Sequence, residues 1–199
     1  MATARKAKAD DGGTRRRLLD ATAQIMHDEG YAAATSRRVA AKAGIRQPLV
    51  HYYFPTMDDL FLAVLRAGAD VALDQMRAAL TDNNPLRALW VLNSDPRRSV
   101  LNTEFMALAN HRKAIGVELR AYAERVRDME TAAVTLVLRA HGVDLNAYPP
   151  VVISMLIAQI ARSLCNEDAV GVTLGHDEMR RFVEQQIDAL AEPSTVSGS

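Results

Sequence analysis

Residues 35–54, TSRRVAAKAGIRQPLVHYYF, contain two short helical patterns separated by a glycine. Thr35 or Ser36 opens the first helix, which ends at Gly44, a residue type that accepts the left-handed backbone of a tight turn. Gln47-Pro48 opens the second, because proline suits the first turn of a helix. Helices this short are not stable alone in water, so both must pack on a neighbour. The segment therefore predicts either a helix-turn-helix or an ordinary helical hairpin.

The two faces of this segment differ in chemistry. Val39, Ala43, Ile45 and Val50 form an apolar side that seats both helices on the preceding helix, and Ala40 is small enough to let them cross closely. Guanidinium, amide and aromatic groups, which can bind base edges and phosphates, occupy the outward positions. These positions are Arg37, Arg46, Gln47, Leu49, His51 and Tyr52. A helical hairpin with a polar surface would show the same pattern, so the spacing alone leaves DNA binding open.

The rest of the chain also reads as helices separated by Gly, Pro and Asn breaks. No segment alternates with period two, and aromatic residues make up only 5% of the sequence, which favours helix over sheet. We expect an all-α fold of about nine helices. Besides the two short ones, they lie at residues 14–29, from residue 57 onward, and at 85–92, 96–110, 113–140, 150–165 and 177–190.

Composition divides the chain into four parts. Residues 1–13 are small and charged without apolar periodicity, which predicts a disordered basic arm. Residues 14–56 form the three-helix, helix-turn-helix domain, and residues 57–191 form a larger helical domain. The Ser/Gly-rich residues 192–199 are expected to be a disordered tail.

The net charge of zero conceals an uneven distribution. Residues 1–56 contain ten Lys or Arg and five Asp or Glu, whereas the remainder contains 14 basic and 19 acidic residues. A basic front end on an acidic body suggests that one end of the molecule meets a polyanion. A solvated charged surface is the alternative, and charge alone does not decide between them.

Several motifs between residues 15 and 65 resemble the N-terminal domain of the tetracycline-repressor (TetR) family. The opening helix ends in EGY at residues 29–31, TSRRVAAKAGI follows at 35–45, and YYF and PTMDDLF follow at 52–61. Gln47-Pro48 is similar to the start of the recognition helix in tetracycline repressors themselves. The resemblance implies a helix-turn-helix DNA-binding domain followed by a helical domain that binds a small ligand and forms a dimer. The double-stranded DNA operator, the effector and a second copy of the chain are therefore the expected partners.

The resemblance also assigns DNA contacts to individual residues. It implies that the base-contacting residues are Arg37, Arg46, Gln47, Pro48, Leu49 and His51. It implies that the phosphate-contacting residues are Thr35, Ser36, Tyr52 and Tyr53. Three positions depart from the family pattern: Leu49 replaces a small or hydroxyl residue, His51 replaces a tyrosine, and Met57 replaces a lysine that would grip a phosphate.

The C-terminal helices carry more apolar surface than one buried face needs. The segment 150–165, PVVISMLIAQIARSLC, is apolar nearly all round, so it is either fully buried or meets a partner chain. In the TetR family the last two long helices form a four-helix bundle with those of a dimer mate, and the resemblance favours the partner. The expected interface residues are Val152, Met155, Ile157, Ile160, Phe182 and Ile187.

The central helices predict the effector site. Methionine and aromatic residues at helical spacing are typical of plain core, but they also suit a pocket that adapts to a bulky apolar compound. The candidate lining residues are Trp90, Asn102, Glu104, Phe105, Met106 and Met129, with Asn102 and Glu104 at the polar end. Because no cluster of cations is expected in the core, a neutral or weakly acidic hydrophobic effector is preferred over a multiply charged anion.

Other functional classes lack the residues they require. The five histidines are scattered and there is one cysteine, Cys165, so neither a metal site nor a disulfide is expected. Phosphate loops, dinucleotide fingerprints and clustered catalytic groups are missing, so neither a cofactor nor enzyme activity is expected. With no signal-peptide pattern and no apolar run long enough for a bilayer, a cytoplasmic location without membrane contact is expected. A helical protein-interaction module remains the alternative.

Overall fold

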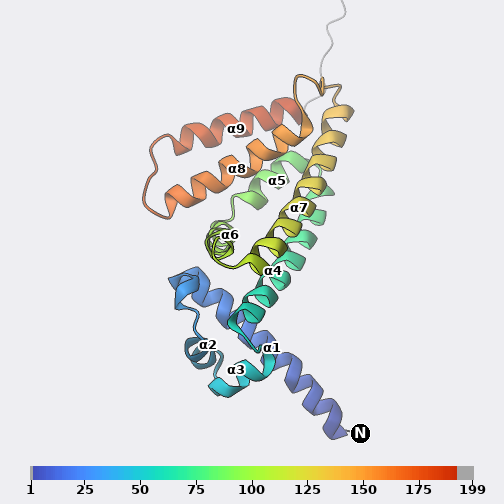
Figure 1. Cartoon of the computed structure of the whole chain (residues 1–199). Coiled ribbons are helices and arrows are strands. Elements are labelled where there is room, and N and C mark those ends of the chain that lie inside the picture. The colour runs from blue at the N-terminus through green and yellow to red at the C-terminus, as the bar shows by residue number, and fades with distance from the viewer. Residues whose placement is uncertain (1, 192–199) are drawn as a thin grey trace, which may run out of the picture. The chain divides into compact units, whose positions relative to one another are not determined.

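The computed structural model describes residues 2–191 and the side chains of residues 12–190. In this range the chain forms nine α-helices and a 3-10 turn and contains no strand, which confirms the all-α prediction (Figure 1). The helices are α1 Ala2–Glu29, α2 Ser36–Ala43, α3 Gln47–Tyr53, α4 Met57–Leu80, α5 Pro85–Asn93, α6 Pro96–Ala109, α7 Lys113–Ala140, α8 Pro150–Asp168 and α9 His176–Ala191, with the 3-10 turn at Tyr31–Ala33. None of these helices is long and apolar enough to cross a bilayer.

The first helix starts earlier than the sequence predicts. α1 begins at Ala2, whereas residues 1–13 were expected to be a disordered arm. The arm is rich in Ala, Lys and Arg, which are good helix formers, and it extends a helix that tertiary packing already stabilises. Gly12 and Gly13 oppose this at about 1 kcal/mol each, which the flanking residues offset. Met1 and the predicted tail at 192–199 lie outside the described residues.

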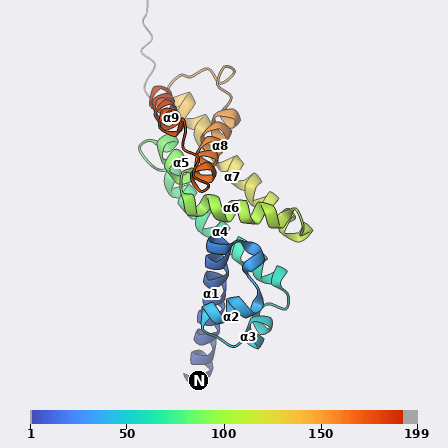
Figure 2. The same cartoon turned by 90° about the vertical axis from the view of Figure 1, so that its left-hand side faces the viewer.

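The first compact unit comprises the residues up to Asp70 together with Val100–Ala121. Here α2 packs against α1, and α3 packs against α2 (Figure 2). Leu18, Ile25 and Met26 of α1 are fully buried, as is Val39 of α2. This core holds the two short helices, which could not form alone.

Local signals in the sequence fix the helix ends in this unit. Gly30 has φ +83° and ends α1, and Gly44 has φ +65° and ends α2. Thr56 and Asp59 form a reciprocal cap at the start of α4. The Thr56 hydroxyl accepts from the Asp59 N–H at 3.1 Å, and the Asp59 carboxylate accepts from the Thr56 N–H at 3.0 Å.

The second compact unit comprises Val71–Ser99 and the described residues from Tyr122 onward. Its core contains Met76, Leu86, Trp90, Val134 and Leu138, with further apolar residues from α8 and α9. α8 and α9 lie side by side in both views (Figure 1). His176 fixes the end of their connection: its side chain is 3% exposed and lies 2.8 Å from Glu167 and 2.9 Å from Asp168.

Candidate nucleic-acid interface and sensing region

The turn between α2 and α3 presents a continuous polar face. Thr35 caps α2, because its hydroxyl accepts a hydrogen bond from the Arg38 backbone N–H at 3.4 Å. The Gln47 amide at the start of α3 donates to the Ser36 hydroxyl at 3.0 Å, which ties the two helix starts together. Val39 and Val50 point inward and are buried. The base-contact candidates remain exposed on this face, namely Arg37, Arg46, Gln47, Pro48, Leu49 and His51.

The cations of this domain fall into two groups. Arg38 forms an ion pair with Glu29, and Lys42 lies 3.8 Å from Asp28, so both are partly neutralised by acids of α1. Arg37 and Arg46 have no ion pair among the described residues. The two arginines that the sequence assigns to base contacts are therefore free to meet an external anion.

Aromatic residues end α3. Tyr52 is 75% exposed, and its ring meets that of Tyr53 edge-on at a centroid distance of 5.2 Å. Phe54 is buried, and the Arg15 guanidinium lies over its ring at 5.2 Å. The two tyrosine hydroxyls, with Thr35 and Ser36, remain the candidates for phosphate contacts.

The residues predicted to line an effector pocket fall in two places. Trp90 is buried in the core of the second unit, and Met129 packs against that core. Asn102, Glu104, Phe105 and Met106 belong to the first unit. Within it, Phe105 is buried, Met106 is 54% exposed, and Asn102 is partly buried.

Glu104 already has a structural partner. Its carboxylate accepts a hydrogen bond from the Tyr31 backbone N–H at 2.7 Å, directly after α1. The sequence could not indicate this bond, since the two residues are far apart in the chain.

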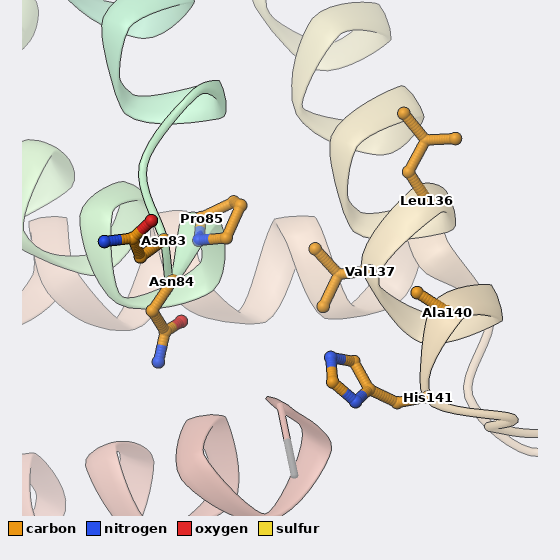
Figure 3. Close-up of a pocket in the computed structure, with 7 residues that line it drawn as sticks. All are labelled: Asn83, Asn84, Pro85, Leu136, Val137, Ala140 and His141. Carbon is orange, nitrogen blue, oxygen red and sulfur yellow. The ribbon is translucent and has the colours of Figure 1, made fainter. Parts of the chain in front are cut away.

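An open depression of about 350 Å³ lies on the second unit. Figure 3 shows Asn83, Asn84 and Pro85 on one side and the end of α7, with Val137 and His141, on the other. None of the predicted effector residues lines it. Within the described chain, no group of three or more His, Cys, Asp or Glu side chains is placed to hold a metal ion.

The expectation that the core lacks a cationic cluster is wrong. Arg98 of α6, Arg127 of α7 and Arg162 of α8 all lie in the second unit. The charge of Arg162 interacts with those of Arg98, Arg127 and the buried Glu130, and with Tyr122. Their only sequence signal was that Arg162 interrupts an apolar helix. Because the three arginines lie on separate helices, the sequence alone could not indicate that they come close together in the folded protein.

The predicted dimer residues separate by exposure. Val152, Met155 and Phe182 are exposed, and Phe182 is 57% exposed. Ile157 and Ile187 are instead buried in the core of the second unit, because they lie on the inward faces of α8 and α9, so they have little surface left for a partner. Ile160 is partly buried. Val151 and Leu156 of α8 and Met179 of α9 are further exposed apolar residues of these two helices.

Comparison with known proteins agrees with this geometry. Residues 18–64, which include α2, α3 and the start of α4, match the model of the bacterial regulatory proteins of the tetR family. Residues 18–64 of the chain are therefore similar to the DNA-binding segment of TetR-family regulators. This matched segment is the one that places Arg37 and Gln47 on an exposed face.

Two curated relatives of this chain carry opposite regulatory names. The transcriptional activator FasR of Mycolicibacterium smegmatis is 36% identical over 72 residues, 35% of this chain and 33% of the relative. The transcriptional repressor KstR of the same organism is 34% identical over 100 residues, 48% of this chain and 49% of the relative. The chain thus spans less than half the length of these curated relatives.

A solved structure shows the fold over a longer range. A putative transcriptional regulator from Saccharomonospora viridis, in complex with choline, has a TM-score of 0.76 at 19% identity. The match covers 89% of this chain and 96% of that one. At this identity the likeness shows the TetR-type fold alone.

Proposed function

We propose that this protein is a transcriptional regulator that binds a palindromic DNA operator as a dimer and releases it when a small, mainly hydrophobic molecule binds. The observation that carries the proposal is the exposed α2–α3 face, where Arg37 and Arg46 have no ion pair among the described residues. A helix start that presents guanidinium and amide groups suits the major groove, where arginine pairs with guanine and glutamine with adenine.

A second copy of the chain is the proposed partner of the α8–α9 surface. Val152, Met155, Leu156, Met179 and Phe182 are each at least 40% exposed. Full burial of an exposed apolar side chain contributes about 1.5–3 kcal/mol, and covering these half-exposed side chains would contribute roughly half of that for each. A twofold dimer would place two recognition helices for a palindrome, with half-sites about 34 Å apart.

Effector binding would act through a shift in population. A ligand that binds better to one spacing of the two recognition helices favours that spacing, and a spacing that no longer fits the grooves releases the DNA. The apolar core around Trp90 and Met129 in the second unit supports a hydrophobic ligand body. We propose repression rather than activation, because the repressor KstR matches over the longer segment of the two relatives.

Selection from a pool of random DNA duplexes tests the proposal. The wild-type protein should enrich sequences with two inverted half-sites, and Arg37→Ala should lose or broaden that enrichment. Enrichment of no sequence, with a folded protein, would contradict an operator-binding role.

A further inference from the structure

A carboxylate is buried at the centre of the second unit. Glu130 of α7 is only 2% exposed. Its Oε1 accepts a hydrogen bond from the Asn93 amide at 3.3 Å, and its Oε2 accepts one from the Ser154 hydroxyl at 2.9 Å. Both oxygens are therefore already engaged by neutral donors from α5 and α8.

Three arginines lie near one another beside this carboxylate: the charge of Arg162 interacts with that of Glu130 and with those of Arg127 and Arg98. Arg98, Arg127 and Arg162 are all partly buried. The Nη2 of Arg98 donates a hydrogen bond to the Tyr122 hydroxyl at 3.2 Å. The Nη1 atoms of Arg98 and Arg127 are buried and have no hydrogen-bond partner among the described residues.

This arrangement is unfavourable without a further anion. Glu130 contributes one negative charge against three positive charges, and buried donors of charged groups are normally paired. Burial and the positive charges of Arg127 and Arg98 lower the pKa of Arg162, while Glu130 opposes this effect. The protein thus holds an excess of positive charge in a place where folding alone does not need it.

We propose that Arg98, Arg127 and Arg162 bind the acidic group, a carboxylate or a phosphate, of the small molecule that the protein senses. The inference rests on the proposed function and specifies the chemistry of its effector. Guanidinium groups match both oxyanions, since their forked N–H donors pair with two oxygens. Glu130, held by Asn93 and Ser154, offsets part of the positive charge around Arg162.

The surroundings favour an effector with a hydrophobic body. Trp90 lies one helical turn before Asn93 on α5, and Met129 precedes Glu130 on α7. Ile157 and Ala161, between Ser154 and Arg162 on α8, belong to the same apolar core as Trp90. An amphiphilic acid would place its head group at the arginines and its chain against these residues.

Thermal unfolding of the full chain with three probes of equal chain length tests the inference. Octanoate and octyl phosphate carry the two candidate head groups, and octanamide is the neutral control, all at constant ionic strength. We expect at least one acid to raise Tm by several degrees in a saturable manner and octanamide to leave Tm unchanged. The acid that gives the larger shift identifies the head group.

Variants distinguish this site from general anion effects. Arg127→Gln and Arg162→Gln should each abolish the shift. Arg87→Gln should retain it, because Arg87 is exposed and pairs with Asp188 on the surface of the same unit. Without a probe, Arg127→Gln should unfold at or above the wild-type Tm, because it removes a repelling charge with an unpaired buried nitrogen.

The inference is overturned by no Tm shift with either acid, by an equal shift with octanamide, or by a shift that persists in both variants. A lower Tm for unliganded Arg127→Gln would show that the arginines are structural. None of these measurements uses DNA, so the inference can fail while operator selection succeeds. Equally, the acids can raise Tm in a protein that selects no operator.

Discussion

Neighbouring arginines on α2 offer a matched pair of variants for DNA recognition. Arg37 is exposed and has no ion pair among the described residues, whereas Arg38 pairs with Glu29 of α1. Replacing either by alanine removes one positive charge from the same helix. Alanine is a good helix former, so neither change should unfold α2. The two variants therefore separate a specific DNA contact from a general loss of charge.

The two variants should lose different amounts of operator affinity. A base-contacting arginine contributes about 1–3 kcal/mol, so Arg37→Ala should weaken operator binding by about 5- to 150-fold. The Arg38 charge is already compensated, and an exposed ion pair contributes about 0–1 kcal/mol. Arg38→Ala should thus weaken binding by less than about fivefold.

Fluorescence anisotropy with the selected operator and with a scrambled duplex measures both effects. Arg37→Ala should lose affinity for the operator much more than for the scrambled duplex, because base contacts carry the sequence preference. Circular dichroism melting checks that both variants are folded. Equal losses for Arg37→Ala and Arg38→Ala, or equal losses on both duplexes, would refute the assignment of Arg37 to a base contact.

Other predictions concern assembly, pH and the contact after α1. Phe182→Asp should convert a sedimenting dimer into a folded monomer, whereas Ile157→Asp should lower Tm because Ile157 is 5% exposed; a wild-type monomer at micromolar concentration would contradict the dimer. The two carboxylates beside His176 raise its pKa above the ordinary value of 6.5, against the opposing effect of burial. Its stabilising contribution should be complete below pH 6.5 and decline as pH rises through the raised pKa, and a His176→Gln variant whose Tm keeps the wild-type pH dependence would refute this. Glu104→Ala should lower the free energy of unfolding by about 1–3 kcal/mol by leaving the Tyr31 N–H unpaired, and Glu104→Gln should lower it less; no loss in a chemical-denaturation curve would contradict that role.

The helices and their ends could be predicted because their signals are local. The predicted helix at 113–140 coincides with α7, and Gly44, expected to end α2, has a positive φ. The exposed face of the helix-turn-helix could also be predicted, since its polar and apolar positions alternate with the helical period. The predicted start of α1 at residue 14 was wrong, because a charged, alanine-rich segment is compatible with both helix and disorder.

The sensing region could not be predicted in the same way. Arg98, Arg127 and Arg162 each look like an ordinary charged residue of an amphipathic helix, and only packing brings Arg162 near Glu130 and near the other two arginines. The buried position of Ile157 could not be predicted either, since an apolar residue on a helix that is apolar nearly all round can face either the core or a partner. Which of these alternatives holds depends on tertiary contacts.

The salt dependence of binding to random double-stranded DNA tests the central claim most directly. A protein that binds phosphates through its helix-turn-helix releases counterions, so the logarithm of its affinity should fall linearly and steeply with the logarithm of salt concentration. We expect such a slope for the wild-type protein. Affinity that is absent at low salt, or that does not change with salt, would contradict the proposal that this protein binds DNA.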